Sequence, residues 1–389
     1  MSKKPVLLDE IKPLERARVR PSRLNLERAQ GERRISLPKR IGHLYEQVIS
    51  EDNCMAAVVE MTKGKNKNKK AMRIRKNSVS YGKRLAAEVS SGGWVATPYI
   101  EHTIEDGVRK KKRNIKVPCL HDQAVHHAVM RVMIPHIIKR NYFYNCGSIP
   151  KAGQNRSIKA VQKWMGKKNG YKYYGKFDIR HFYETCPHWA VMNALKRIFK
   201  DKKLLALNEQ ILESMGNGLA IGFYPAQWYA NIVLMDLDNQ IVQKVLPGCK
   251  YTRYMDDMLV LHKNKRKLHK ARKVIEIILK GLGLILNPKW QVSKIGDQGI
   301  TFLSYRFFRG YTLMKKNLMY RITRKINKTK TSLNIHNARS VASYLGILKQ
   351  CNSFNYRNKW LYHAVSIKKL KGVIAHESRI RNYATVVQT

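Results

Sequence analysis

The sequence is poor in acidic residues. Only 26 Asp and Glu stand against 76 Lys and Arg, which gives a formal net charge of +50. The basic excess extends over the whole length of the chain and is not confined to a tail. This balance predicts a polyanionic partner, because basic side chains displace the counterions that condense on phosphates. Nucleic acid is the main expectation, and an anionic membrane surface is the alternative.

Long apolar runs and paired cysteines are also missing. No run of 18 apolar residues occurs, so we expect no membrane-spanning segment, and Met1–Arg20 lacks the apolar core of a signal peptide. The six cysteines show no CxxC spacing, which is typical of reduced thiols in a cytosolic protein and disfavours a zinc site. A GxxxxGK[ST] phosphate loop is absent too, which disfavours a P-loop enzyme.

What is present predicts several lobes of one enzyme, because 389 residues with 44% hydrophobic content can bury a sizeable core. Residues 1–40 are basic and interrupted by proline, and we expect an arm that orders on nucleic acid. The stretch Lys63–Asn77 predicts a basic polar loop, and Val108–Lys116, with strand-like flanks, a hairpin with a cationic turn. The alternation of strands and helices predicts an α+β fold, with a parallel βαβ sheet as the alternative.

Three acids interrupt apolar strands. RYMDDMLVL places Asp256 and Asp257 in one predicted strand or strand hairpin, and KFDIRHFYETCP places Asp178 at the end of another. A buried charge costs several kcal/mol unless it is paired or holds a metal. Catalysis by two metal ions needs carboxylates from different segments, and Mg²⁺ prefers oxygen ligands. The acids therefore predict a magnesium site if the strands are neighbours; strand-end caps or salt-bridge partners of Arg and Lys are the alternative.

The order of motifs resembles that of reverse transcriptases over roughly residues 41 to 360. YMDD is similar to the family's hallmark, FDIRHFY to the preceding palm motif, and GLAIGFYPAQWYAN to the loop–helix motif that contacts template and nucleotide. LGLILNPKWQV resembles the next palm motif, and GITFLSYRF resembles the primer-grip segment. The resemblance implies a right-hand polymerase with an antiparallel palm sheet: a basic N-terminal arm (1–40), fingers (41–172), palm with fingers–palm helices (173–308) and a basic helical thumb (309–389).

Within the family, the likeness points to enzymes of diversity-generating retroelements in phages and bacteria. Their loop–helix motif carries an aliphatic residue, Gly and a later Ser-Gln; Ile221, Gly222 and Gln227 match, and Ala226 departs. This implies error-prone cDNA synthesis at adenines in the cytoplasm of a bacterial or phage-infected cell. The implied partners are an RNA template, a DNA or RNA primer, deoxynucleoside triphosphates and a small basic accessory protein, with no membrane.

Two other functions stay open on the sequence alone. One is a retron-like or phage-defence reverse transcriptase. The other, from a different class, is a catalytically inactive polymerase scaffold that binds RNA. Intact acids at the three positions disfavour the inactive scaffold, since unpaired carboxylates in apolar strands would then be unexplained.

The resemblance also implies roles for single residues. Two Mg²⁺ ions, with Mn²⁺ as a substitute, would be held by Asp178, Ile179 and Asp256, and Asp257 would be the supporting third catalytic acid. The nucleotide would be bound by Lys111, Arg113, Tyr183, Ile221, Gly222 and Gln227. Template and primer would be contacted by Asn231, Tyr254, Met255, Phe302, Leu303, Ser304 and Tyr305.

Three of these roles come with further expectations. Tyr183 would exclude a ribose 2′ hydroxyl, with ordinary strand packing as the alternative. Lys289 would be the general acid for pyrophosphate, with a solvated loop lysine as the alternative. Ser304 stands where the family usually has Gly, which predicts a less tight primer-grip turn. For Lys111 and Arg113 the alternative is nonspecific attraction of phosphates.

Overall fold

The computed structural model describes residues 39–106, 111–150, 152–166 and 170–386. By its internal contacts the chain divides into Met1–Lys39 and Arg40–Thr389, and almost all described residues belong to the second unit. The predicted N-terminal arm, residues 1–40, therefore lies almost entirely outside the described residues.

The strands form three antiparallel sheets. The first pairs β1 (Ile100–Asp106) with β2 (Lys111–Val117) and confirms a hairpin, but Lys111–Lys116, predicted in its turn, belong to β2, and residues 107–110 lie outside the described part. The central sheet has the order β4-β5-β3-β6, with β3 at Tyr173–Phe177, β4 at Lys250–Tyr254, β5 at Asp257–His262 and β6 at Gln291–Lys294. The third contains β7 (Ile300–Phe302), β8 (Tyr305–Phe308) and β9 (Tyr311–Met314). The α+β prediction is confirmed, and within the described part no parallel βαβ sheet occurs.

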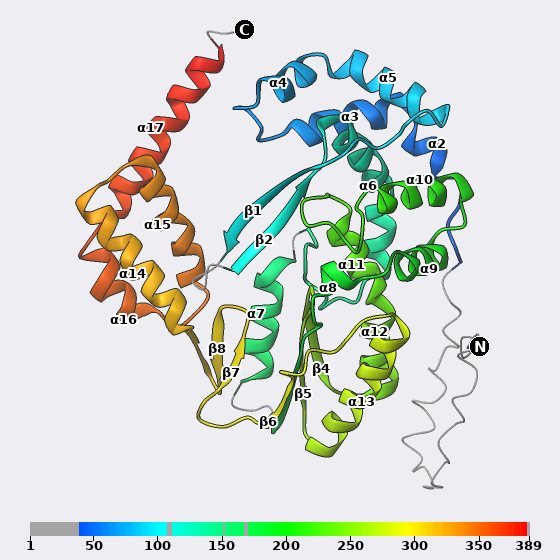
Figure 1. The fold of residues 1–389 in the computed structure, drawn as a ribbon. Helices are drawn as coiled ribbons and strands as arrows, with labels where there is room; N and C mark the ends of the chain where they lie inside the picture. The colour runs from blue at the N-terminus through cyan, green and yellow to red at the C-terminus, as the bar shows by residue number, and fades with distance from the viewer. Residues whose placement is uncertain (1–38, 107–110, 151, 167–169, 387–389) are drawn as a thin grey trace, which may run out of the picture. The chain divides into compact units, whose positions relative to one another are not determined.

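Helices precede, separate and follow these sheets (Figure 1). Up to β3 they are α2 (Tyr45–Val48), α3 (Glu51–Thr62), α4 (Lys69–Lys76), α5 (Ser78–Ser90), α6 (Leu120–Arg140) and α7 (Gly153–Trp164). After β3 come α8 (Phe182–Thr185), α9 (His188–Ile198), α10 (Lys202–Glu213), α11 (Ala226–Val233), α12 (Met235–Gln240), the π-helical η1 (Ile241–Val245) and α13 (Lys265–Gly281). The C-terminal group is α14 (Lys316–Thr331), α15 (Ile335–Leu348), α16 (Phe354–Tyr356), the π-helical η2 (Arg357–Tyr362) and α17 (Ile367–Val386). Among the described residues, no helix combines the length and the apolar character that a bilayer crossing requires.

The predicted loop at Lys63–Asn77 is wrong in its second half, which forms α4. Asn68 caps this helix, because its side chain accepts a hydrogen bond from the backbone N–H of Ala71 at 3.0 Å. Ala71 and Ile74, three residues apart, are buried on one face of the helix, which packs on α3 and α5. A prediction based on charge overlooked these two apolar positions at helical spacing.

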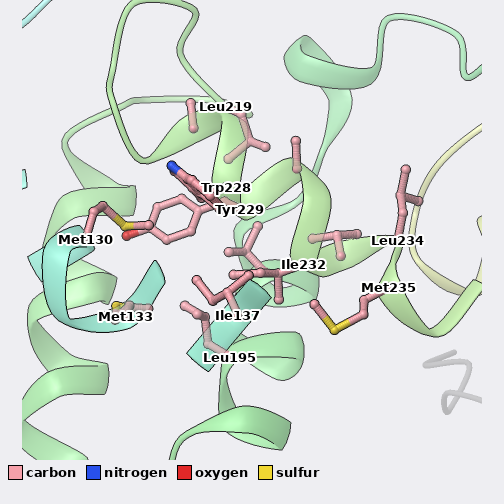
Figure 2. Close-up of a cluster of buried hydrophobic side chains, with 14 of the residues drawn as sticks. Met130, Met133, Ile137, Leu195, Leu219, Trp228, Tyr229, Ile232, Leu234 and Met235 are labelled. Atoms are coloured by element: carbon pink, nitrogen blue, oxygen red, sulfur yellow. The ribbon is translucent and has the colours of Figure 1, made fainter. Parts of the chain in front are cut away.

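The largest core joins α6, α9 and α11 (Figure 2). Its members in the figure include Met130, Met133 and Ile137 of α6, Leu195 of α9, and Trp228, Tyr229 and Ile232 of α11. A second core joins α7 to the central sheet and to β7–β9, and a third holds α14, α15, η2 and α17 together. The first core fixes α11, and with it the loop that precedes this helix.

Two histidines of α6 pack against that loop. His126 is fully buried between Trp94 and Phe223, and neither of its ring nitrogens has a hydrogen-bond partner among the described residues. His127 stacks on Tyr224, with 4.1 Å between the ring centroids. Burial lowers the pKa of His126 to about 3 and that of His127 to about 4. Both rings are therefore neutral in the folded protein at pH 7.

We expect acidification to destabilise the protein through His126. An unfolded histidine titrates near pH 6.5, whereas the folded ring stays neutral down to about pH 3, so between these values the unfolded state binds the extra proton. This contribution to stability is fully present above pH 6.5 and is lost as the pH falls; by pH 5 the loss is roughly 2 kcal/mol.

Urea unfolding between pH 5 and pH 8 measures this contribution. His126→Leu should weaken the pH dependence of the free energy of unfolding. His336→Gln, at an exposed position, should leave it as in the wild type. Equal pH dependence in the wild type and His126→Leu would contradict the expectation.

Candidate active site

The central sheet brings the three predicted acids to one end. β3 pairs with β5 so that Phe177 lies opposite Met258, and the next residue, Asp178, comes beside the start of β5. Asp257 is the first residue of β5, and Asp256 precedes it in the turn between β4 and β5. The charge of Asp178 contributes to the raised pKa of both Asp256 and Asp257, so the three carboxylates lie within electrostatic range of one another.

Burial and repulsion between carboxylates raise the pKa of Asp256, in the turn, and of Asp257, at the start of β5. Burial is the largest cause of the raised pKa of Asp256, followed by the neighbouring Asp178. Burial also raises the pKa of Asp257 to about 6; Lys176 opposes this rise, and Asp178 and Asp256 add to it. The Lys176 Nζ lies 3.6 Å from Asp257 Oδ1, and this oxygen has no hydrogen-bond partner among the described residues. The acids are thus held in an environment that opposes their ionisation.

Asn287, in the segment after α13, fixes Asp178. Its Nδ2 donates to Asp178 Oδ2 at 2.7 Å, and its backbone N–H donates to the Asp178 carbonyl at 2.8 Å. Ile179, which is buried, forms an antiparallel bridge with Leu286 and ties the two segments together. The backbone N–H of Lys289 donates to Asn287 Oδ1, while its side chain is exposed. Sequence reasoning missed Asn287, although it stands in the recognised LNPK stretch.

The turn that carries Asp256 is held in a strained conformation. Met255 has a φ of +57°, which is uncommon for a residue other than glycine. Tyr254, half-buried, pairs with the first residue of β5 across this two-residue turn. Gly147 lies so close that a Cβ there would come within 2.6 Å of the Met255 backbone nitrogen. Arg253 Nη1 donates to the Met255 carbonyl at 2.8 Å. The contacts around the turn therefore impose a conformation that the local sequence disfavours.

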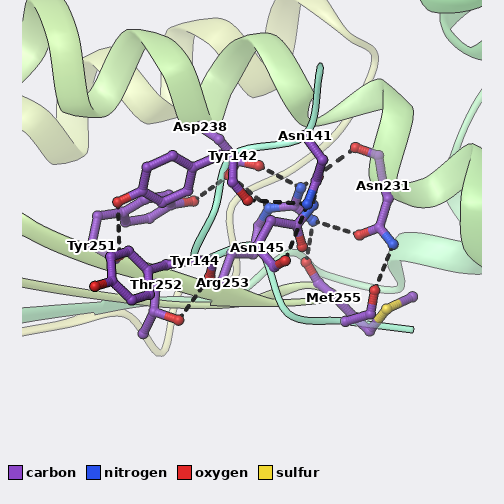
Figure 3. A network of polar contacts seen from close by, with 11 residues as sticks. Asn141, Tyr142, Tyr144, Asn145, Asn231, Asp238, Tyr251, Thr252, Arg253 and Met255 are labelled. Carbon is purple, nitrogen blue, oxygen red and sulfur yellow. Dashed lines mark hydrogen bonds and ion pairs between the residues drawn. The ribbon is translucent and has the colours of Figure 1, made fainter. Parts of the chain in front are cut away.

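Arg253 is fully buried beneath the turn and is the centre of a polar network (Figure 3). Its Nε donates to Asp238 Oδ1 at 2.7 Å, and its Nη2 donates to Asp238 Oδ2 at 2.6 Å. Nη1 also donates to Asn231 Oδ1 at 3.2 Å. Tyr251 donates its hydroxyl to Asp238 Oδ1 at 2.7 Å. A bidentate pair with further hydrogen bonds is the geometry in which attraction best offsets the desolvation of buried charges.

The structure corrects the predicted role of Asn231. This side chain is fully buried, and its Nδ2 donates to the Gly147 carbonyl at 2.7 Å, so it has no surface for a template. Asn231 instead joins the Gly147 segment to Arg253. Sequence reasoning also missed Arg253 and Asp238. Neither residue carried a clear signal, because β4 (KYTRY) also contains Lys250 and Thr252, and Met235–Gln240 (MDLDNQ) is mainly polar.

The loop before α11 is fastened to β2 and α8. The backbone N–H of Lys116 donates to the Ile221 carbonyl at 2.8 Å. Gly222 has a φ of +116°, and a Cβ at this position would lie 2.2 Å from the Lys116 carbonyl oxygen. The backbone N–H of Leu219 donates to the Tyr183 carbonyl at 2.6 Å. Only glycine permits this approach, so Gly222 lets the β1–β2 hairpin dock on the loop.

Two further residues predicted at the nucleotide lie near the acids. The pKa of Tyr183 is raised, first by burial and then by the charge of Asp256, so the two side chains lie within electrostatic range of each other. The charge of Arg113 opposes the rise in the pKa of Asp256, so this residue of β2 lies within electrostatic range of it. Gln227 is exposed on the first turn of α11. The side chain of Lys111, the first residue of β2, lies outside the described part of the chain.

The predicted primer-grip segment forms the turn between β7 and β8. Phe302 and Tyr305, both buried, pair directly, so Leu303 and Ser304 form a two-residue turn. The expectation of a looser turn at Ser304 is wrong, because the positive φ of +53° falls on Leu303 and Ser304 needs no glycine-like conformation. The backbone N–H of Lys315 donates to the Ser304 carbonyl at 3.1 Å and links the turn to the start of α14.

The carboxylates fit a magnesium ion only in part. Among the described residues, no group of three or more His, Cys, Asp or Glu side chains could hold a metal ion. Mg²⁺, however, usually takes one or two carboxylates and completes its shell with water and substrate phosphates. Asp178 and Asp256 are two carboxylates that repel each other, and a divalent cation relieves such repulsion. The residues therefore fit a Mg²⁺ ion that shares its coordination with a bound phosphate.

Comparison with known proteins gives a family match over residues 104–307, more than half of the chain, to "Reverse transcriptase (RNA-dependent DNA polymerase)". A retron Ec73 reverse transcriptase from Escherichia coli is 31% identical over an alignment of 119 residues, and the match covers 28% of this chain and 37% of that protein. The matched part thus spans well under half of that curated relative.

Solved structures give a more distant likeness. Apo telomerase from Candida tropicalis has a TM-score of 0.46 at 14% identity, over 68% of this chain and 60% of that one. Telomerase from Candida albicans, solved with a fragment of telomeric RNA, has a TM-score of 0.44 at 12% identity, over 72% and 60% of the two chains.

We expect the Arg253–Asp238 pair to be strongly coupled. Asp238→Leu leaves a buried guanidinium uncompensated and should lower the free energy of unfolding by about 3–5 kcal/mol. Replacing both residues, Arg253→Met with Asp238→Leu, should cost less than either single change, because two buried charges disappear together.

Urea unfolding of the wild type, the single variants Arg253→Met and Asp238→Leu, and the double variant measures the coupling. The exposed ion pair of Arg197 and Asp236 is a matched control, and its removal should change stability by less than about 1 kcal/mol. A double variant whose loss equals the sum of the two single losses would contradict the coupling.

Proposed function

Because the chain belongs to the reverse transcriptase family, we propose that it is an RNA-directed DNA polymerase that copies an RNA template into cDNA. The observation that carries this proposal is the convergence of Asp178, Asp256 and Asp257 at one end of the central sheet, inside the matched segment. Stability alone does not account for this cluster, since Asp178 raises the pKa of both Asp256 and Asp257, and Asp256 raises that of Asp257 further. The inactive-scaffold alternative would leave the cluster unexplained.

In this proposal the chain's own residues form a preorganised metal and primer site. Asp178, Ile179 and Asp256 would hold Mg²⁺, and Asp257 would support them. Mg²⁺, when bound there, lowers the pKa of a primer 3′ hydroxyl and neutralises charge on the departing pyrophosphate. Arg253 holds the strained turn, so Asp256 faces Asp178 without reorganisation at the moment of reaction.

The nucleotide and primer are placed around these acids. Tyr183, within electrostatic range of Asp256, excludes a ribose 2′ hydroxyl, and Arg113 contacts the triphosphate with its planar, multiply donating guanidinium. Ile221, fastened to β2, lies at the nascent base pair. The β7–β8 turn grips the primer end. The proposed lobes are fingers at 41–172, palm at 173–308 and thumb at 309–389.

The more specific function that we propose is that of a retron-like reverse transcriptase. The similarity to the retron Ec73 enzyme supports it, although the matched part covers 37% of that protein. A second candidate is the error-prone enzyme of a diversity-generating retroelement, with a small basic accessory protein. That candidate is favoured by the aliphatic Ile221 before Gly222 and by Gln227 in the loop–helix motif.

Asp256→Asn should abolish DNA synthesis while RNA binding is retained. The change removes one of two metal-binding carboxylates, so we expect the rate of primer extension on a defined RNA template with Mg²⁺ to fall roughly a hundredfold or more. The exposed Asp297→Asn is the control and should extend primers at the wild-type rate. Unchanged synthesis by Asp256→Asn would show that the metal assignment is wrong.

Sequencing the cDNA from the same reaction distinguishes the two candidates. The retron-like reading predicts errors that are not concentrated opposite any one template base. Errors concentrated opposite adenines, and reduced in Ile221→Gln, would contradict it and favour the diversity-generating reading.

A further inference from the structure

The helix α4 and the turn before it carry charge of one sign only. The stretch KGKNKNKKAMRIRK, residues 63–76, contains eight basic residues and no acidic residue. Lys69, Arg73 and Lys76 recur at the spacing that aligns side chains along one face of a helix, opposite the buried Ala71 and Ile74. All three are exposed. We call these three residues the α4 basic face.

Neither helix stability nor ion pairing accounts for this face. Lys69 stands in the first turn, where the positive end of the helix dipole disfavours a cation. Among the ion pairs that the described residues form, none includes a side chain of the α4 basic face. Lys65 behaves differently, because its Nζ turns inward to Gln123 Oε1. The face is therefore open to an anion from outside the protein.

We propose that the α4 basic face binds the phosphate backbone of double-stranded RNA, at a site apart from the catalytic acids. A row of Lys and Arg along one helix face is the electrostatic footprint of a nucleic-acid contact. Sites for single strands add aromatic side chains on which bases stack, and residues 63–77 contain no Phe, Tyr or Trp. Double-stranded RNA, in contrast, is bound through its shape, its phosphates and its 2′ hydroxyls.

A membrane surface fits this helix less well. A helix that lies on a bilayer inserts an apolar face among the lipids. The apolar side of α4 is already covered, because Ala71 and Ile74 are buried and the helix packs on α3 and α5 (Figure 1). Met72, 45% exposed, is the one large apolar side chain on the helix that is markedly exposed. Among polyanions, the α4 basic face therefore fits nucleic acid.

The site lies outside the segment that matches the family, residues 104–307. It rests on the proposed function only in naming the ligand, a double-stranded region of the RNA that the enzyme copies. Binding can be measured in the full-length Asp256→Asn variant without any DNA synthesis, so failure of this proposal and failure of the proposed function give different results.

The test compares two sets of three charges. One variant carries Lys69→Gln, Arg73→Gln and Lys76→Gln, which keep helix propensity. The matched control carries Lys265→Gln, Arg266→Gln and Lys270→Gln, which remove three exposed charges from α13. Fluorescence anisotropy measures binding to an RNA duplex of about 20 base pairs and to a DNA duplex of the same sequence, over a range of salt concentrations.

The α4 variant should bind the RNA duplex at least about tenfold more weakly, and its log–log salt slope should fall by about two to three, since three phosphate contacts are lost. The control should bind as the wild type does, and the loss on the DNA duplex should be smaller. A further variant that keeps all three charges, with Lys69→Arg, Arg73→Lys and Lys76→Arg, should bind the RNA duplex as the wild type does.

Equal affinity and slope for the α4 variant and the control would overturn the proposal. Equal losses on the RNA and DNA duplexes would overturn its assignment to RNA. Phosphatidylserine vesicles that bind the wild type and not the α4 variant, with RNA affinity unchanged, would overturn it in favour of a membrane surface.

Discussion

The buried ion pair between Arg253 and Asp238 is the constraint on which the site depends. A guanidinium with no exposed surface is held in place by both oxygens of one carboxylate, and its remaining donors reach Asn231 and the Met255 carbonyl. One side chain therefore ties α11, α12 and the β4–β5 turn together. The strained φ at Met255 persists because this network and the close approach of Gly147 determine it from beneath. The pairing of Tyr254 with Asp257 closes the turn, and the ion pair adds a fixed donor to the Met255 carbonyl between them.

Unlike the buried ion pair, Asp256 and Asp257 are not stabilised as charged groups by their surroundings. Their burial and mutual repulsion raise the pKa of Asp256 and of Asp257, so the fold gains no stability from keeping them together. In a chain with a formal net charge of +50, carboxylates could easily have been paired with abundant basic side chains. Among the described residues, Asp257 forms one ion pair, with Lys176 at 3.6 Å. The repulsion among these carboxylates disfavours the folded protein without a metal ion, and the same repulsion favours binding of a cation that also has phosphate ligands.

Local sequence patterns predicted much of this arrangement, but they did not predict the side-chain pairs between residues far apart in the sequence. The strand hairpin around YMDD, the β1–β2 hairpin and the antiparallel α+β fold follow from apolar strand patterns, motif order and turn positions. The Arg253–Asp238 pair does not, since it joins a strand to a helix, and a single sequence does not say which acid an arginine meets. Asn231 was predicted as a template contact from the family resemblance, and its burial depends on long-range partners that the sequence does not identify. At Leu303 and α4 the error was local: a positive φ fell on an unexpected residue, and two apolar positions were hidden among basic ones.

The measurement that tests the central claim most directly is the single-turnover rate of DNA synthesis by the Arg253→Met, Asp238→Leu double variant, compared with its free energy of unfolding. The replacement removes the donor to Met255 while it keeps the interior apolar. If the ion pair holds the catalytic turn, the rate should fall roughly tenfold or more even where stability matches that of the wild type. A wild-type rate in a variant of wild-type stability would contradict the claim, and would show that the sheet alone positions the acids.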